Sequence, residues 1–139
     1  MTAIKPPAKR PCGSCPYRRD VPSGIWHESE YAKLPEYDKE TWEQPPGVFL
    51  CHQQDGCVCA GWAAVSANED TIALRFASID GRIDFETLDA IIDYATDVPL
   101  FSTGAEAAAH GLTNVADPDK DAHRVMAKLE RRRAARAHL

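Results

Sequence analysis

The sequence predicts a mainly α-helical protein in which an irregular N-terminal metal-binding knuckle packs on about four short helices. Three observations lead to this prediction. All five cysteines of the 139-residue chain lie between residues 12 and 59. Eight of the ten prolines precede residue 50, and proline disfavours long regular elements. After residue 60, apolar residues recur at helical spacing between residues that commonly start and stop helices.

The chain is short enough to form one domain, which we expect over residues 12–137. A disordered arm rich in proline and basic residues would precede it over residues 1–11. The knuckle would span residues 12–62 and the helical part residues 63–137. The sequence contains no signal-like apolar run near residue 1 and no stretch of about 18 apolar residues. We therefore expect a cytoplasmic protein with no membrane partner.

Within the knuckle, the order of residues predicts turns and one short strand. The apolar run at residues 48–50 is typical of a small strand, and Asp55-Gly56 is a tight-turn dipeptide. Cys57 and Cys59 follow at a spacing of two. Residues i and i+2 of an extended segment point to the same side, so both sulfurs would face one centre.

The second half predicts a series of helices. Residues 60–67 fit one short helix, and residues 69–79 fit either a strand or a helix, of which we favour the helix. Asp84 is a good N-cap for a helix over about residues 85–95. Thr103 and Glu106 match a capping box.

The capping box at Thr103 predicts a short helix ending at Gly111. Asp117-Pro118 would start the last helix as N-cap and first residue. Its apolar stripe ends at Leu129, so we expect the basic end over residues 131–139 to extend into solvent.

The cysteines and one histidine form the strongest chemical pattern in the chain. They occur as Cys12-x-x-Cys15, Cys51-His52 and Cys57-x-Cys59. Tetrahedral zinc needs four such ligands, and a C-x-x-C supplies two from a single turn. The ligand set that we favour consists of Cys12, Cys15, Cys51 and Cys59. Cys57 and His52 are the alternates, and His52 fits equally a supporting role beside a ligand.

The same four cysteines would also suit an iron–sulfur cluster. A zinc ion is the first expectation, a cluster is the second, and a set of thiols without metal is the third. An odd number of cysteines cannot all pair within one chain, which argues against a purely disulfide framework.

Charge is distributed unevenly between the body and the end of the chain. Residues 120–139 hold seven Lys or Arg and two acidic residues, whereas the whole chain has a net charge of −5. Arg131, Arg132, Arg133 and Arg136 are candidates for contact with nucleic acid or with a protein partner. No aromatic residue interleaves with these arginines, so the segment itself offers no stacking platform.

A family resemblance covers most of residues 10–111. The runs RPCGSCPYRRDVPSGIW, FLCHQQDGCVCAGW and PLFSTGAEAAAHG resemble an uncharacterised family of small cysteine-rich proteins of actinobacteria and their phages. The shared pattern is C-x-x-C-P-[FY]-R, then C-H, then C-A-G. It implies a metal site in which Cys57 ranks below Cys59. The first run also faintly resembles the WhiB-like iron–sulfur regulators, although a further cysteine of that pattern is absent here.

These observations favour a binding or regulatory module with a structural zinc ion over an enzyme. The sequence shows no Ser/His/Asp triad, P-loop or GxGxxG motif. A protein partner is the first expectation and nucleic acid, through the basic C-terminal helix, the second. The alternative class is an iron–sulfur protein that responds to redox conditions, or a small oxidoreductase.

Overall fold

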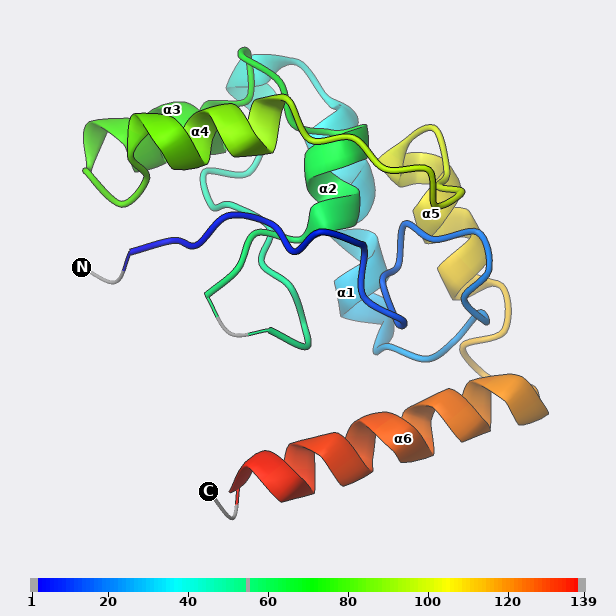
Figure 1. The fold of residues 1–139 in the computed structure, drawn as a ribbon. Coiled ribbons are helices and arrows are strands. Elements are labelled where there is room, and N and C mark those ends of the chain that lie inside the picture. The colour runs from blue at the N-terminus through cyan, green and yellow to red at the C-terminus, as the bar shows by residue number, and fades with distance from the viewer. Residues whose placement is uncertain (1–2, 55, 138–139) are drawn as a thin grey trace.

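The computed structural model describes residues 3–54 and 56–137 (Figure 1). The elements are α1 (Glu28–Ala32), the 3-10 helices η1 (Leu34–Asp38) and η2 (Thr41–Glu43), α2 (Ala60–Val65), α3 (Ile72–Ile79), α4 (Phe85–Ile92), α5 (Gly104–Leu112) and α6 (Lys120–Ala137). Within these residues there are isolated β-bridges but no strand. The prediction of a mainly α fold is confirmed. The strand expected at residues 48–50 is reduced to one bridge, between Leu50 and Val58.

The core is built around the short helix α2. Trp62 of α2 is completely buried, and its ring meets that of Tyr37 edge to face at a centroid distance of 5.3 Å. Phe49 joins the same aromatic cluster from the segment before Cys51. Helix α4 packs on both α2 and α3. The aromatic core is therefore built partly from residues next to Cys51 and Cys59 in the sequence, Phe49 and Trp62.

Helix α5 packs closely on α1 and η1 because two of its residues are glycines. A Cβ on Gly104 would collide with the backbone of Leu34, and a Cβ on Gly111 would collide with the ring of Tyr31. The expectation that Gly111 stops this helix is wrong. The helix continues to Leu112, and Gly111 is needed for close packing instead.

Two of the expected helix starts are confirmed and one is shifted. The side chains of Asp84 and Thr103 accept hydrogen bonds from the amides of Thr87 and Glu106 as N-caps. The last helix, α6, begins at Lys120 rather than at Pro118. Asp119 replaces Asp117 near its start, since Asp119 Oδ1 accepts a hydrogen bond from the Ala122 amide at 2.8 Å.

The N-terminal arm is ordered where the structure describes it, in contrast to the disorder expected over residues 1–11. The Ile4 amide donates to Arg82 O at 3.0 Å, and Lys5 forms a parallel bridge with Cys57. Backbone pairing supplies the partners that the sequence pattern of this arm does not indicate. Residues 1–2 lie outside the described residues.

Helix α6 crosses beneath the rest of the protein (Figure 1). Ala122 is buried against Val21 and Ile25 in a second, small hydrophobic cluster. Leu129 is 9% exposed. Residues 131–137 are exposed to solvent, as expected, although the side chains of Arg132 and Arg136 reach back to bond to Gln53. Residues 138–139 lie outside the described residues.

No helix in the described ranges has the length and apolar character required to cross a membrane.

Candidate metal centre

Three segments of the knuckle bring the cysteines together. Cys12 and Cys15 share one turn, in which the Cys15 amide donates to Cys12 O at 3.0 Å. Cys51 and Cys59 are linked by backbone pairing, because the Cys51 amide donates to Cys57 O and the Cys59 amide donates to Phe49 O. Cys15 and Cys59 are buried, whereas the other three cysteines are partly exposed.

The sulfur atoms of the four favoured cysteines form a chain of neighbours. Cys15 Sγ lies 3.9 Å from Cys59 Sγ. The Cys12 thiol lies near enough to the thiols of Cys15 and Cys51 for both to shift its pKa, in opposite directions. Among the described residues, no group of three or more His, Cys, Asp or Glu side chains is placed to hold a metal ion.

All five cysteines line one small cavity of about 10 Å³, which we call the thiol cavity. The remaining residues of its wall are Ala8, Arg10, Gln54, Val58 and Ala60. A volume of this size is close to that of one water molecule. The fold therefore brings the five thiols to the wall of one small space.

The surroundings raise the pKa of three of the thiols. The pKa of Cys51 is raised chiefly by the adjacent Cys12 thiol and then by burial. The pKa of Cys12 is raised chiefly by the Cys15 thiol, with burial adding to the effect and the Cys51 thiol opposing it. These thiols are protonated near pH 7, so a metal ion that bound them would release protons.

Backbone amides point at the same sulfurs and favour their thiolate forms. The Gln53 amide donates to Cys51 Sγ at 3.4 Å. The backbone of Ser14 and of Tyr17 likewise opposes the rise in the pKa of Cys12 and of Cys15. In each case the donor lies two residues after the cysteine. These three amides would stabilise negative charge on metal-bound sulfur.

Gly61 allows α2 to approach the cysteine turn closely. A Cβ at this position would lie 2.5 Å from Cys15 Sγ and 2.7 Å from Tyr17 Cβ. Gly61 follows Cys59 by two residues, so the first turn of α2 sits against the sulfur of Cys15. Sequence reasoning did not assign this role, although the C-A-G motif contains the residue.

The two alternate ligands occupy different places. Cys57 lines the thiol cavity, and its Sγ lies 3.8 Å from Gln54 Oε1. The described wall of that cavity does not include His52. His52 Nε2 instead lies 2.8 Å from Glu30 Oε1. Because a carboxylate only accepts, Nε2 carries the proton in this pair.

Of the two arginines after the cysteine turn, Arg18 lies near the cysteines. Its Nη1 donates to Cys12 O at 3.4 Å and to Pro11 O at 3.0 Å, and Asp20 pairs with the same guanidinium. Arg19 contacts a different region, stacking over the Phe101 ring at 4.9 Å. Arg18 is therefore the residue placed to offset thiolate charge.

Gln53 connects the thiol cavity to α6, and no sequence motif pointed to it. Its side-chain amide donates to Ser14 Oγ, between the two cysteines of the turn. Its Oε1 accepts from Arg132 Nη1 at 2.7 Å, and its backbone oxygen accepts from Arg136 Nη1 at 2.5 Å. Two of the four arginines expected to contact a partner thus hold the loop that carries Cys51.

The fold and the thiol cavity together define a small, mainly α-helical protein that gathers four thiols from separate segments of its chain. The chain matches the DUF6283 family, described as a family of unknown function, over residues 7–133. This match covers most of the chain and all five cysteines, so the protein belongs to that family. No curated protein and no solved structure matches the chain.

Proposed function

We propose that this protein is a cytoplasmic binding or regulatory module whose N-terminal half is stabilised by one zinc ion. Cys12, Cys15, Cys51 and Cys59 would hold the ion as thiolates. The single observation that supports this proposal most strongly is that these thiols line one cavity although they come from three segments. The same residues carry the C-x-x-C-P, C-H and C-A-G pattern of the cysteine-rich family resemblance.

One pair of sulfurs already has the spacing that a tetrahedral zinc site requires. Zinc–sulfur bonds of about 2.3 Å place neighbouring sulfurs roughly 3.8 Å apart in a regular tetrahedron. The Cys15–Cys59 pair, at 3.9 Å, already has this spacing.

The size of the thiol cavity favours one ion over an iron–sulfur cluster. About 10 Å³ is room for a single small species, whereas a cluster has two or more irons with bridging sulfides. An iron–sulfur role, including one of the WhiB-like kind, would need a larger opening of the same loops. It remains the second candidate because the donor set of four cysteines suits it.

A structural ion would replace the regular secondary structure that the knuckle lacks. It would tie together residues that are far apart along the chain, such as Cys15 and Cys59, which are separated by 44 positions. Four thiolates with one Zn²⁺ carry a charge of about −2. Arg18 and the cavity-lining Arg10 are placed to offset part of it.

Metal analysis of two matched variants tests the proposal. Protein purified without added metal should contain about one zinc per chain, and Cys15→Ser should lose both the zinc and most of the thermal stability. Cys57→Ser is the control, since Cys57 is the cysteine left out of the proposed set, and it should keep both.

Three results would count against a zinc site of this composition. One is wild-type protein that is fully folded without metal. Another is Cys15→Ser protein with unchanged zinc content. The third is iron with stoichiometric sulfide and broad visible absorption in protein prepared without oxygen, which would establish the iron–sulfur alternative.

A further inference from the structure

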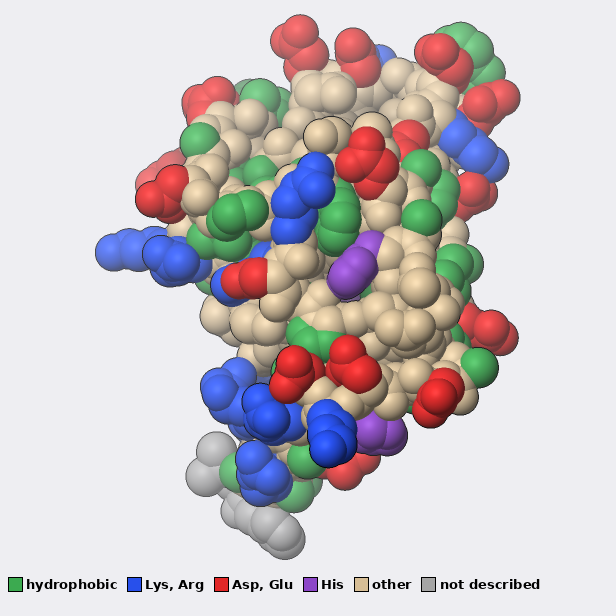
Figure 2. Space-filling model, turned by 90° about the vertical axis from the view of Figure 1, so that its right-hand side faces the viewer, with side chains coloured by type: hydrophobic (Ala, Val, Ile, Leu, Met, Phe, Trp, Pro, Cys, Tyr) green, Lys and Arg blue, Asp and Glu red, His purple; other side chains and the backbone are tan. Residues whose placement is uncertain are grey.

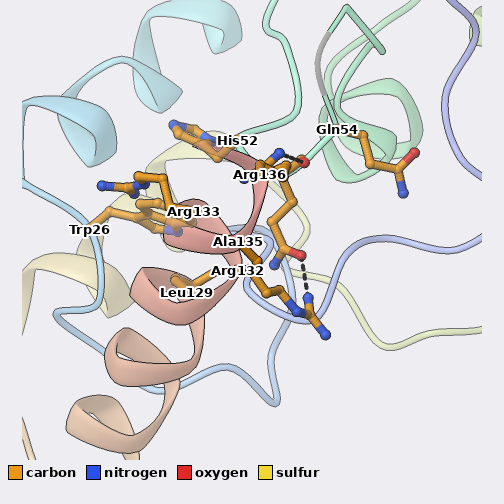
Figure 3. Close-up of a pocket in the computed structure, with 9 residues that line it drawn as sticks. Trp26, His52, Gln54, Leu129, Arg132, Arg133, Ala135 and Arg136 are labelled. Atoms are coloured by element: carbon orange, nitrogen blue, oxygen red, sulfur yellow. Dashed lines mark hydrogen bonds between the residues drawn. The ribbon is translucent and has the colours of Figure 1, made fainter. Parts of the chain in front are cut away.

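A second cavity, of about 360 Å³, lies between α6 and the loop after Cys51 (Figure 3). We call it the arginine pocket. Its wall includes Trp26, His52, Leu129, Arg132, Arg133 and Arg136. Pockets of this size accommodate small organic ligands. The side chains come from three parts of the chain that are distant in sequence, so the pocket exists only in the folded protein.

Two flat rings are held in fixed positions in this wall. The Trp26 and His52 rings stack with centroids 4.5 Å apart and an interplanar angle of 31°. Trp26 Nε1 donates to Ser14 O at 2.9 Å, and His52 Nε2 is paired with Glu30. Both rings are therefore oriented by contacts outside the pocket. They supply the aromatic surface that the basic segment itself lacks.

The pocket is also cationic. Arg132, Arg133 and Arg136 line the arginine pocket, and no acidic side chain among the described residues does so. In Figure 3, Arg133 lies on the side of Trp26, while Arg132 and Arg136 reach the loop of Gln53. Figure 2 shows Lys and Arg side chains gathered at the end of the molecule where α6 lies. This cluster contrasts with the net negative charge of the chain.

We propose that the arginine pocket binds a nucleotide unit, either free or within a single strand. The base would lie against the Trp26–His52 side, and the phosphate would pair with Arg133, with Arg132 and Arg136 adding positive charge. An inorganic anion would leave the rings unused, and an acidic peptide would not need a flat surface. The inference deepens the proposed function and rests on it, because the metal centre would hold the Gln53 loop that forms one wall.

The test uses full-length, metal-loaded protein and isothermal titration with adenosine triphosphate, inorganic triphosphate and a single-stranded DNA 12-mer. We expect the nucleotide or the 12-mer to bind at least about tenfold more tightly than triphosphate, because stacking of one base contributes roughly 1–3 kcal/mol. Arg133→Ala should weaken that binding about tenfold or more, as expected for loss of a charged hydrogen bond. Arg131→Ala removes the same charge outside the pocket wall and should change affinity less than about twofold.

The choice between the two probes identifies the source of the nucleotide. Binding of adenosine triphosphate points to a free nucleotide, and binding of the 12-mer alone points to a single strand. Equal losses in Arg133→Ala and Arg131→Ala would show charge attraction without a site and would overturn the proposal. Three other results would also overturn the proposal. One is inorganic triphosphate that binds as tightly as the nucleotide probe that binds, another is displacement of that bound probe by hexaglutamate at equal concentration, and the third is no binding of any probe. If zinc is present in the protein that fails to bind, the pocket assignment falls and the proposed zinc function stands.

Discussion

At the scale of single residues, the thiol cavity depends on small side chains as much as on cysteines. Gly61 lets the first turn of α2 touch the Cys15 sulfur, while Gly13, inside the cysteine turn, has open space around its Cβ position. Neither glycine has a positive φ, so their difference is one of packing alone. Comparing an alanine substitution at each glycine therefore separates the effect of crowding the Cys15 sulfur from the effect of merely adding a methyl group near it.

Gly61→Ala should destabilise the protein because the new methyl group would overlap Cys15 Sγ and Tyr17 Cβ. Overpacking of this kind costs about 1–3 kcal/mol. Urea unfolding of metal-loaded protein measures the change, and Gly13→Ala serves as the control with an expected change of less than about 0.5 kcal/mol. Equal midpoints for the two variants would show that α2 does not pack on the cysteine turn as described.

At the scale of elements, the start of α5 is stabilised by a residue far away in the sequence. Asp38, at the end of η1, accepts hydrogen bonds from the amides of Gly104 and Ala105 at 2.9 and 2.8 Å. Thr103 accepts from the Glu106 amide. Three amides that a helix start leaves unpaired are thus satisfied. These hydrogen bonds connect the start of α5 to the end of η1.

Asp38→Ala should lower the free energy of unfolding by about 1–2 kcal/mol, the usual effect of losing a helix cap. Thermal or urea unfolding measures the loss. Asp97→Ala, at an exposed position in the connection from α4 to α5, is the matched control and should have little effect. The same loss in both variants would attribute the effect to net charge rather than to capping.

Asp84, the N-cap of α4, predicts a pH dependence of stability. Hydrogen bonds from Thr87, first of all from its backbone amide, lower the pKa of this carboxyl. A group whose pKa is lower in the folded state contributes stability above its unfolded pKa of about 3.9, and that contribution is lost as the pH falls through the folded pKa. The stability difference between wild type and Asp84→Ala should therefore be full at pH 6 and shrink below about pH 4. Urea unfolding across this range would reveal the trend, and a difference independent of pH would contradict it.

At the scale of the whole molecule, α6 lies across the knuckle and restrains it through contacts along its length. Ala122, near its start, and Leu129, near its middle, are buried, and its last turns are held by the bonds of Arg132 and Arg136 to Gln53. Gln53 also contacts Ser14 and the Cys51 sulfur. The C-terminal helix is therefore connected to the thiol cavity through one residue, and the arginine pocket lies along this connection.

Deleting residues 131–139 should leave the body folded, because the buried core residues all precede them. The loop of Gln53 would lose both arginine contacts, so we expect thiols in metal-free protein to react several-fold faster with a colorimetric thiol reagent. The reaction rate of Arg131→Ala protein, which keeps both contacts, is the comparison. A deletion variant with an unchanged thiol reaction rate would show that α6 does not restrain the loop. A large loss of thermal stability would show that the core depends on the deleted segment.

Local patterns in the sequence determined the class of the fold and most helix positions. The caps at Asp84 and Thr103 were predictable because a cap depends on residues three positions apart. The cysteine spacing likewise indicated which thiols belong together, since a C-x-x-C turn is a local structure. The structure places all five cysteines around one cavity, Cys57 included, so the ligand set stays a prediction.

Only the tertiary structure decided what the remaining residues contact. It turned His52 toward Glu30, placed Gly111 inside α5 against Tyr31, and docked the arginines of α6 on Gln53. Each of these outcomes depends on side chains from segments that are distant in sequence, and hydrophobic periodicity and capping signals carry no information about such neighbours. The sequence by itself therefore determined the helices and the number of thiols. Long-range packing decided that all five thiols line one cavity and which arginines line a pocket.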